Sequence, residues 1–428
     1  MTLSLARRAE RSPDRTAVVD ISEGRLYAPA ETVHEDRVSY GGLSRIVAQT
    51  AGALAERGVE SGDTVCLVTR NRVASIALLF ACRRLGATLA PISHRLTPTT
   101  VKRPFDALEP TLVVAEAAQR DLVRSIPFDR TVTLEQLADA DASTVDTAER
   151  PSDADAPLLA LHGTPGQPVV AFAPSTVEWN CISAIVAWGL SRDDSGIVLD
   201  PLSAPDGLFR TALPLLYVGG RLLLDRAFDP GDALTAIDHH VVTVLGGRAA
   251  PVRELAADEN AGALARVERA ICDQTVEEGA TETLLEHGVS VSRAYGLLEC
   301  PTAMSRTVSG PTEGDAVGRP VLDCRARLVD DGTVLEGAAD GTLQLSGPVV
   351  ADGYVNPADT GDAGGSREAK QEPESDAETR QGRGENGDGD EGSAAGSGDG
   401  SDGGEFTNGW FDTGDRFRRD EDGVYYRS

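Results

Sequence analysis

Apolar residues near the start of the chain repeat first at helical spacing and then in short continuous runs. Leu43, Ile46 and Leu54 share one face of a helix, which predicts an amphipathic helix over residues 43–54 with Gly58 as its C-terminal stop. The segments expected next are a strand at 64–69, a helix at 73–80 and strands at 87–92 and 111–115. This alternation is typical of a parallel sheet covered by helices.

The alternation resumes after a polar stretch at residues 138–156. Ser175 and Glu178 have the spacing of a capping box, because each side chain can satisfy a free backbone N–H of the first turn. They predict a helix that continues to Trp188. We therefore expect one α/β body over residues 1–310. Its remaining strands are expected at 158–161, 169–172, 197–199, 222–224, 241–245 and 289–294.

Two segments depart from this pattern towards the C-terminus. Residues 318–354 are rich in Gly and Asp and lack a helical period, so we expect a small β subdomain formed by 311–357 together with 406–428. Residues 361–404 contain no Val, Ile, Leu, Met, Phe, Trp, Tyr or Cys. Such a segment cannot bury enough apolar surface to offset its ordering entropy, and we expect a disordered acidic insertion at 358–405.

The charge of the chain limits its partners. The 428 residues include 68 acidic and 40 basic side chains, which gives a net charge of −28. This balance repels phosphate backbones, so we expect no nucleic-acid partner. The acidic composition also fits a halophilic, salt-adapted cytoplasm, with biased base composition as the alternative explanation.

Cysteine spacing and apolar run length indicate the compartment. The six cysteines show no CxxC pairs, which favours buried reduced thiols over a disulfide framework or a zinc site. No apolar stretch reaches the length of a membrane span, and the N-terminal residues lack the apolar core of a targeting signal. We therefore expect a cytoplasmic protein with no membrane span.

Candidate chemistry begins with the segment from His162 to Pro168 (HGTPGQP), which lies between two predicted strands. Gly163, Thr164 and Gly166 allow backbone N–H groups to converge on an anion, as in a phosphate-binding nest. A Gly/Pro hairpin explains the same residues. This segment alone does not decide between the two.

Six segments in a fixed order change that balance. They are GVESGDTV (58–65), ACRRLGATLAPI (81–92), RAYGLLE (293–299), VGRP (317–320), GY (353–354) and GWFDTGD (409–415). Together they resemble the AMP-forming adenylating enzymes, the superfamily of acyl-CoA synthetases, adenylation domains and luciferases. The resemblance implies the large N-terminal α/β domain of that family, with parallel-rich sheets, flanking helices and a small β subdomain.

The resemblance also implies an activity and the residues that carry it. Family members join a carboxylic acid to ATP, forming an acyl-adenylate, and then pass the acyl group to coenzyme A. By this resemblance, Tyr295 would lie against adenine, Glu299 would be the catalytic residue that helps hold Mg²⁺, and Asp415 would accept hydrogen bonds from the ribose hydroxyls. The implied nucleotide-binding residues are Gly163, Thr164, Gly166, Tyr295, Gly296 and Asp415.

Several positions depart from the family pattern. The family's phosphate loop reads roughly TSGTTGxPKG, but Pro165 replaces a Thr and Val169 replaces the Lys, while Leu298 replaces the Thr of YGxTE. A degenerate phosphate loop is expected, because Pro165 also lacks a backbone N–H. The family continues into a C-terminal domain with a catalytic Lys, which we expect to be absent here. Lys102 and Lys370 are the only lysines, and neither is expected to replace it.

Two functions follow as hypotheses. The first is an AMP-forming acid–CoA ligase with ATP or AMP, Mg²⁺ and coenzyme A as cofactors, a carboxylic acid as substrate and, in a split form, a separate chain that supplies the C-terminal domain. The second is a catalytically degenerate paralogue that binds an adenine nucleotide or an acyl ligand. Two or three lost phosphate contacts are expected to impair adenylation strongly.

Overall fold

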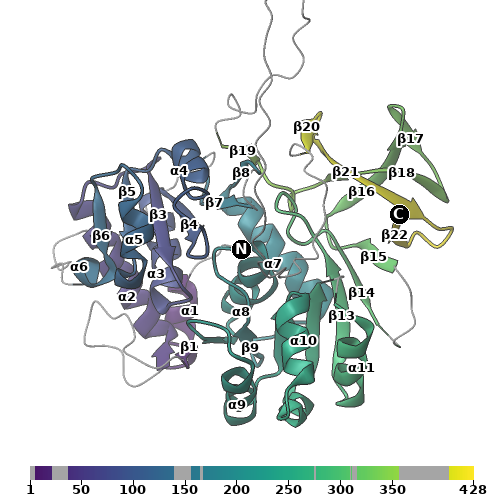
Figure 1. Ribbon diagram of the computed structural model, residues 1–428, viewed down its shortest axis with the longest axis horizontal. Helices are drawn as coiled ribbons and strands as arrows, with labels where there is room; N and C mark the ends of the chain where they lie inside the picture. The colour runs from purple at the N-terminus through teal and green to yellow at the C-terminus, as the bar shows by residue number, and fades with distance from the viewer. Residues whose placement is uncertain are drawn as a thin grey trace, which may run out of the picture.

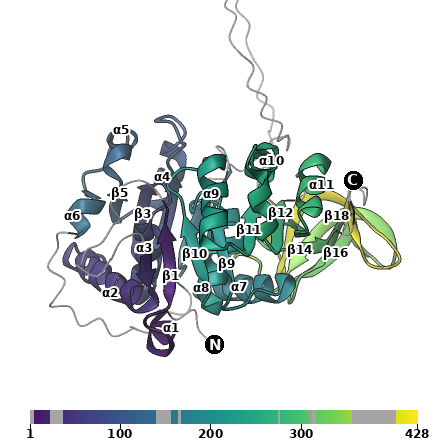
Figure 2. The ribbon, with the colours of Figure 1, turned by 90° about the horizontal axis from the view of Figure 1, so that it is seen from below.

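A computed structural model describes residues 5–21, 37–138, 156–163, 167–273, 276–308, 310, 316–355 and 404–428. Within them the chain forms two sheets with packed helices, followed by a β-rich end (Figures 1 and 2). The helices are α1 (Leu5–Arg11), α2 (Tyr40–Glu56), α3 (Val73–Leu85), α4 (Lys102–Leu108), α5 (Arg120–Arg124), α6 (Leu134–Ala138), α7 (Pro174–Trp188), α8 (Leu213–Val218), α9 (Pro230–His240), α10 (Ala249–Ala257) and α11 (Glu278–Glu286). Short η1 (Ala117–Gln119), η3 (Asp206–Ala212) and η4 (Ala261–Arg266) complete the helical segments described.

The smaller sheet has the strand order β19-β8-β7-β4-β3-β5-β6. Its central strands β7, β4, β3, β5 and β6 run parallel, whereas β8 and β19 pair antiparallel. The bounds are β3 (Thr64–Thr69), β4 (Thr88–Ser93), β5 (Leu112–Ala115), β6 (Thr131–Thr133), β7 (Leu159–His162), β8 (Val169–Phe172) and β19 (Gly353–Tyr354).

The larger sheet begins with a parallel part that carries β13 to the site. Its order is β14-β13-β12-β11-β9-β10-β1-β2, with antiparallel pairing only at β14 and β2 among these strands. The bounds are β1 (Thr16–Asp20), β2 (Arg37–Ser39), β9 (Ser195–Val198), β10 (Arg221–Leu224), β11 (Val244–Gly247), β12 (Arg269–Asp273), β13 (Ser290–Tyr295) and β14 (Met304–Thr307).

The sheet then continues into antiparallel strands at the C-terminal end. Their order from β14 outwards is β15-β22-β21-β18-β16-β17, and β20 pairs with β21. The bounds are β15 (Ala316–Pro320), β16 (Arg325–Asp330), β17 (Thr333–Leu335), β18 (Ala339–Ser346), β20 (Glu405–Thr407), β21 (Trp410–Arg419) and β22 (Tyr425–Arg427). These strands form the small β part that the sequence predicts.

Side-chain alternation explains why the helices lie between and outside the sheets. On β3, Val65 and Leu67 join a core shared with α2 and α3, whereas Cys66 and Val68 join the core under α4 and α5. Since successive side chains of a strand point to opposite faces, both faces of this sheet are covered. The first core also contains α7, α8 and residues of β10, so these helices form a layer between the two sheets.

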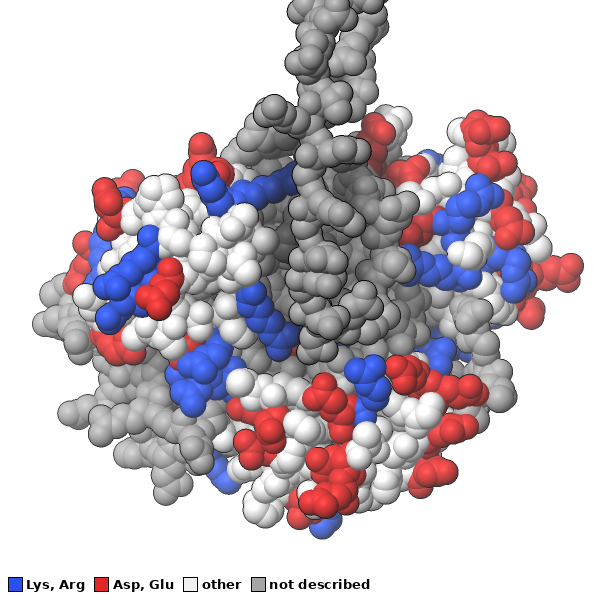
Figure 3. Space-filling view, viewed as in Figure 1, with Lys and Arg blue, Asp and Glu red and all other residues white. Residues whose placement is uncertain are grey.

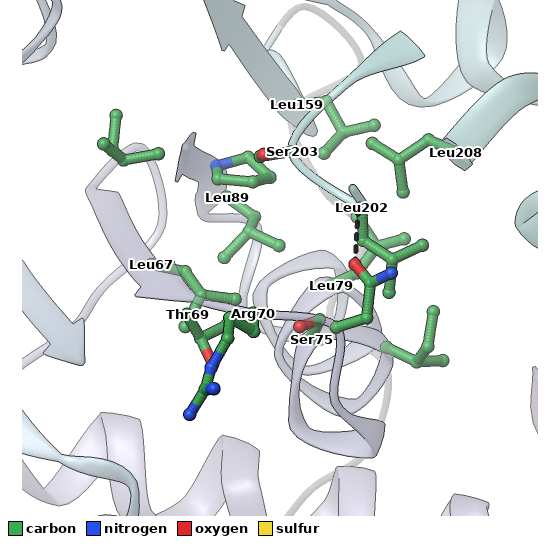
Figure 4. Close-up of a pocket in the computed structure, with 14 residues that line it drawn as sticks. Leu67, Thr69, Arg70, Ser75, Leu79, Leu89, Leu159, Leu202, Ser203 and Leu208 are labelled. Atoms are coloured by element: carbon green, nitrogen blue, oxygen red, sulfur yellow. Dashed lines mark hydrogen bonds between the residues drawn. The ribbon is translucent and has the colours of Figure 1, made fainter. Parts of the chain in front are cut away.

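Asn71 joins the two halves across this layer. Its Oδ1 accepts from the backbone N of Leu202 at 2.8 Å, and its Nδ2 donates to the carbonyl O of Asp200 at 3.2 Å. Figure 4 shows the small cavity beside this contact, with Leu67 and Leu89 on one side and Leu202 and Leu208 nearby. At about 10 Å³ the cavity has room for about one water molecule, so it is a packing gap and not a ligand site.

Most predicted elements of the α/β body are confirmed, but the predicted capping box is wrong. Helix α7 begins at Pro174, and its N-cap Ala173 has no side-chain cap. Asp352 instead accepts from the Ala173 backbone N at 2.6 Å and from the Thr176 hydroxyl at 3.0 Å. Glu178 accepts from the hydroxyl of Tyr217 at 2.8 Å. The carboxylate of Asp352 therefore caps the N-terminus of α7 in place of the predicted capping box.

Two strand boundaries also differ from the prediction. β11 starts at Val244 and not at 241, because Val241 ends α9 in a left-handed conformation with φ 50°. β19 pairs with β8 of the smaller sheet, although residues 353–354 were expected in the small β subdomain. The division at residue 310 stays a prediction.

The predicted insertion at 358–405 falls almost wholly outside the described residues, which stop at 355 and resume at 404. Glu405 is described and already belongs to β20. All six cysteines are buried free thiols, as expected. In the part of the chain with described coordinates, no helix combines the length and apolar character needed to cross a bilayer.

Candidate functional site

A tight turn after β13 carries three of the predicted site residues. The backbone N of Leu297 donates to the carbonyl O of Cys300 at 3.0 Å. Gly296 is required here, since a Cβ at this position would lie 2.1 Å from the carbonyl O of Pro301. The turn therefore presents Tyr295 and Glu299 at its two ends.

Tyr295 and Asp415 come together, as the resemblance implied for neighbours of one nucleotide. The Tyr295 hydroxyl lies 3.2 Å from Asp415 Oδ2, and Asp415 Oδ1 lies 3.2 Å from Nη2 of Arg427. The ring of Tyr295 is 2% exposed and packs edge-on against Phe417, with centroids 5.2 Å apart. Burial and the neighbouring Asp415 carboxylate raise the pKa of Tyr295. Protein donors thus occupy both carboxylate oxygens of Asp415.

Glu299 contacts Tyr354 of β19. The Tyr354 hydroxyl oxygen lies 3.0 Å from Glu299 Oε1 and 2.7 Å from the carbonyl O of Gly404. Burial raises the pKa of Glu299 above its usual value, against the opposing hydrogen bonds. Tyr354 is placed to donate to both acceptors, and because a hydroxyl has one proton, the two oxygens share it.

An open cleft of about 370 Å³ lies beside this turn. It brings Gly163, from the end of β7, to Gly296 and Leu298 of the turn after β13. The remaining lining residues are Ser93, Arg95, Leu96, His162, Gln167, Pro201, Ser203, Ala204, Pro205, Asp206, Arg210, Arg248, Asp273, Leu297 and Pro301. Two segments more than one hundred residues apart, both singled out by sequence, therefore share one cleft.

His162 fixes the geometry of the cleft at the carboxyl ends of β4 and β7. Its Nε2 accepts from the backbone N of Ser93 at 3.0 Å, and its Nδ1 lies 2.9 Å from the carbonyl O of Gly163. These partners assign the proton to Nδ1. Burial lowers the pKa of His162, so the neutral imidazole joins the two strand ends.

The predicted site residues do not all meet. Gly163 and Gly296 line the cleft, whereas Tyr295, Glu299 and Asp415 lie outside its lining. Thr164 and Gly166 lie outside the described residues. Tyr295, Glu299 and Asp415 are nevertheless linked to the cleft through the one turn that also holds Gly296.

Lys102 lies nearer the loop than its sequence position suggested. It lines a second cleft of about 390 Å³ together with Arg103, Gln167 and Val169. Gln167 also lines the first cleft. Figure 3 shows basic side chains over α4, on a molecule whose acidic side chains gather over α9 and α10. Lys102 therefore lines a cleft together with residues of the candidate phosphate loop, although it lies far from them in sequence.

Sequence reasoning missed the charged residues of the cleft wall. Asp206 and Arg210 are four positions apart on η3 and form an ion pair, and Asp273 Oδ2 lies 3.6 Å from Arg210 Nη1. The sequence contained a signal. Arg210 lies within the leucine-rich run at residues 208–216, and Asp206 lies two positions before that run. Charged residues are rarely buried without partners.

Comparisons with known proteins identify the family to which this α/β fold belongs. The model of the family described as AMP-binding enzyme matches residues 5–355, so the chain belongs to the AMP-binding enzyme family. A feruloyl-CoA synthase from Amycolatopsis sp is 26% identical over 358 residues, which cover 81% of this chain and 70% of that protein. An indoleacetate–CoA ligase from Aromatoleum aromaticum is 28% identical, covering 75% and 68%. The chain is an acid–CoA ligase-like member of the family.

Solved structures agree on the fold. The o-succinylbenzoate CoA synthetase of Bacillus subtilis in complex with AMP superposes with a TM-score of 0.76 at 18% identity, covering 99% of this chain and 97% of that chain. ATP-bound MatB from Rhodopseudomonas palustris gives a TM-score of 0.77 at 21% identity, covering 100% and 78%. The fold predicted from the motif set is therefore confirmed.

The described residues fit a magnesium nucleotide in part. Mg²⁺ bound to nucleotide phosphates needs only one or two protein carboxylates, and Glu299 is the carboxylate that the resemblance implies for it. No group of three or more His, Cys, Asp or Glu side chains suited to a metal ion occurs among the residues with described positions. A metal held mainly by the phosphates of ATP fits this arrangement better than a site built by the protein alone.

Proposed function

We propose that this chain binds ATP and a carboxylic acid at the cleft between Gly163 and Gly296 and activates the acid for transfer to coenzyme A. The observation that carries the proposal is the shared cleft itself, which brings the glycine loop and the turn after β13 together. Bound Mg²⁺ would offset phosphate charge. The acid enters beside Ala204 and Gly296, which both line the cleft.

The roles of the individual residues belong to the same proposal. Gly163, Thr164 and Gly166 bind phosphate through backbone N–H groups, and Glu299 supplies the carboxylate for Mg²⁺. Asp415 accepts hydrogen bonds from the ribose hydroxyls, at lone pairs that Tyr295 and Arg427 leave open. Tyr295 borders the adenine base. Because this residue is 2% exposed, the residues that cover it must move when the nucleotide binds.

A second function is favoured by two apolar side chains. Val169 is 2% exposed and Leu298 lines the cleft, at positions where the family pattern has a Lys and a Thr. Neither side chain can donate a hydrogen bond to phosphate. The second candidate is therefore a protein that binds the nucleotide and the acid but forms the adenylate slowly.

One pair of measurements separates the candidates. Calorimetric titration with AMP and with Mg-ATP tests binding, and pyrophosphate exchange with a panel of carboxylic acids tests adenylation. Both are run over a series of KCl concentrations, because the acidic composition suggests a halophilic protein. Binding with exchange supports the ligase, and binding without exchange supports the second candidate. No binding of either nucleotide at any salt concentration contradicts both.

The proposal also includes a split ligase, in which a separate chain supplies the C-terminal domain and its catalytic Lys. Exchange and thioester formation are measured again after addition of a candidate C-terminal domain. An increase in thioester formation that requires both chains supports a split ligase. Unchanged rates contradict it.

A further inference from the structure

The glycine loop leaves the smaller sheet at the carboxyl end of β7. β7 ends at His162 and β8 begins at Val169, and these two residues are paired in the antiparallel ladder. Residues 163–168 therefore connect two strands whose ends are held together. Of this connection, Gly163 and Gln167 line the cleft of the proposed site. The position of the end of β7 thus decides where the loop meets the cleft.

On its other side, β7 has little backbone pairing with β4. The two strands are in register at Leu89 and Leu159, the first residue of β7. No further pair in register follows between these two described strands, although β4 continues to Ser93. Parallel strands are ordinarily joined by evenly spaced backbone hydrogen bonds, so the end of β7 needs another connection to β4.

The imidazole of His162 supplies this connection. Its Nε2 accepts from the backbone N of Ser93 at 3.0 Å, and its Nδ1 donates to the carbonyl O of Gly163 at 2.9 Å. One neutral ring thus bonds the end of β4 through one nitrogen and the first residue of the loop through the other. Ser93, His162 and Gly163 all line the cleft, so this bridge lies in the cleft wall.

The bridge is a feature of this sequence and not of the family pattern. In the pattern TSGTTGxPKG, a Ser stands where this chain has His162. A serine hydroxyl is bonded directly to Cβ and reaches less far than the imidazole Nε2, so the contact to Ser93 depends on the histidine. Val169, which replaces the Lys of the pattern, is apolar and 2% exposed. The base of the loop therefore has an imidazole bridge and no ammonium group.

We propose that His162 is a positioning residue for the nucleotide phosphates. Its imidazole ties the end of β7 to the end of β4 and so holds Gly163 in the cleft wall before a ligand arrives. Phosphate binding at a backbone that is already held in place costs less conformational entropy, so the bridge raises the affinity for phosphates and not for the nucleoside. The side chain itself does not contact the nucleotide in this role. The inference rests on the proposed function, since it concerns the phosphate end of the same cleft.

The test compares ATP with adenosine, which has no phosphate. Calorimetry measures ATP binding, and ligand-observed NMR measures the weaker binding of adenosine. Both solutions contain EDTA and no Mg²⁺, so that a metal-binding carboxylate does not affect the comparison. We expect His162→Leu to weaken ATP binding about tenfold or more and to change adenosine binding by less than about twofold. Unchanged ATP affinity, or equal losses for the two ligands, overturns the inference.

Two further variants separate the bridge from the bulk of the ring. His162→Gln keeps a neutral acceptor and a donor on one side chain, so we expect its ATP affinity within about threefold of the wild type. His162→Asn is too short to reach Ser93 and is expected to behave as His162→Leu, which keeps the test decisive if the Leu variant does not fold. ATP affinity as low in His162→Gln as in His162→Asn overturns the inference.

The matched controls use an exposed histidine of α9. His239→Gln and His239→Leu should bind ATP and adenosine as the wild type does. Thermal unfolding checks that each variant at residue 162 or 239 is folded.

Proton uptake distinguishes positioning from direct contact. A phosphate beside the ring would favour the imidazolium form, so ATP binding would then take up a proton at His162. The bridging imidazole stays neutral. Calorimetry in two buffers of different ionisation enthalpy measures the uptake, and we expect equal values for the wild type and His162→Gln. Uptake that is lost in His162→Gln overturns the positioning role.

Wild-type binding distinguishes the two levels of failure. If ATP binds the wild type and every His162 variant equally well, the positioning role fails and the proposed function stands. If neither ATP nor AMP binds the wild type, the proposed function fails as well.

Discussion

The hydroxyl oxygen of Tyr295 lies 3.2 Å from Oδ2 of Asp415, so the last residue of β13 is tied to the middle of β21 across 120 positions of the chain. Asp415 also contacts Arg427 of β22. The carboxylate that the proposed function assigns to ribose is thus already held by two protein donors. Each carboxylate oxygen keeps a second lone pair, at which a ribose hydroxyl can donate.

Asp415→Asn tests this role directly. We expect AMP affinity to fall about tenfold or more, because a charged acceptor is lost at the ribose. Tyr295→Phe removes only the competing hydroxyl and is expected to keep AMP binding within a few fold. Calorimetry measures both, with thermal unfolding as a check that each variant is folded. Unchanged AMP affinity in Asp415→Asn contradicts the assignment.

Glu299 gives a prediction about pH. Burial raises the pKa of this carboxyl in the folded protein, so the folded chain holds the proton to a higher pH than the unfolded chain does. The stability that this adds is complete below the ordinary pKa and is lost as pH rises through the folded pKa. Glu299→Gln stays neutral and should be more stable than the wild type at the high end of a scan from about pH 4 to about pH 8.

The measurement is the unfolding temperature of both proteins across that scan. Glu282→Gln, at an exposed position of α11, is the control and should follow the wild type. Mg-ATP affinity of the wild type should rise with pH over the same range, because the metal requires the ionised carboxylate. A pH-independent difference between Glu299→Gln and the wild type contradicts the prediction.

Lys102 provides a test of the phosphate end of the site. It shares a cleft with Val169 and Gln167, so an ammonium there can attract the polyphosphate of ATP. We expect Lys102→Met to weaken ATP binding about fivefold and to leave AMP binding nearly unchanged, since an exposed point charge contributes at most about 1 kcal/mol. Equal losses for ATP and AMP would argue against a role at the distal phosphates.

Glu116 is a structural carboxylate with a predicted acid transition. Burial alone would raise its pKa, but hydrogen bonds from Arg70 and Arg72 outweigh burial and lower the pKa from 4.5 to about 2. Its Oε1 lies 2.8 Å from Arg70 Nη2 and 2.6 Å from Arg72 Nη2. The stability from this contact is present above about pH 4.5 and lost as pH falls towards about 2.

Glu116→Gln should therefore lower the free energy of unfolding by up to about 3 kcal/mol at neutral pH and by much less near pH 2. Urea unfolding at the two pH values measures the difference. Glu135→Gln, at an exposed residue of α6, serves as the control. A constant loss at both pH values would show that the effect is not due to ionisation.

The sequence predicted the local elements well where one rule dominated. The apolar run of β3 lies at residues 64–69 as expected, and Gly58 has the positive φ of 76° typical of a helix stop. The strand predicted at 241–245 begins later, because Val241 is the left-handed C-cap of α9. Strand β1 was missed, since its pairing with β10 depends on residues two hundred positions away.

The site was predicted only in part for the same reason. Motifs identified Gly163, Gly296 and the Tyr295 to Asp415 relationship, because a family pattern carries them. Arg210 of η3 pairs with Asp206 and contacts Asp273 of β12. No sequence spacing predicts that residues 210 and 273 meet. Asp352, which caps α7, lies 179 positions from Ala173 in the sequence. No local pattern predicts this contact.

The contact between Tyr354 and Gly404 has a consequence for how this family member tolerates changes in length. The hydroxyl of Tyr354 lies 2.7 Å from the carbonyl oxygen of Gly404, so the chain leaves and re-enters the folded body at nearly one point. Joining two adjacent ends costs little more for a long connection than for a short one. Deletions, duplications or insertions between Tyr354 and Gly404 should therefore leave the folded body intact. New chain ends or a fused protein can be introduced between these two residues.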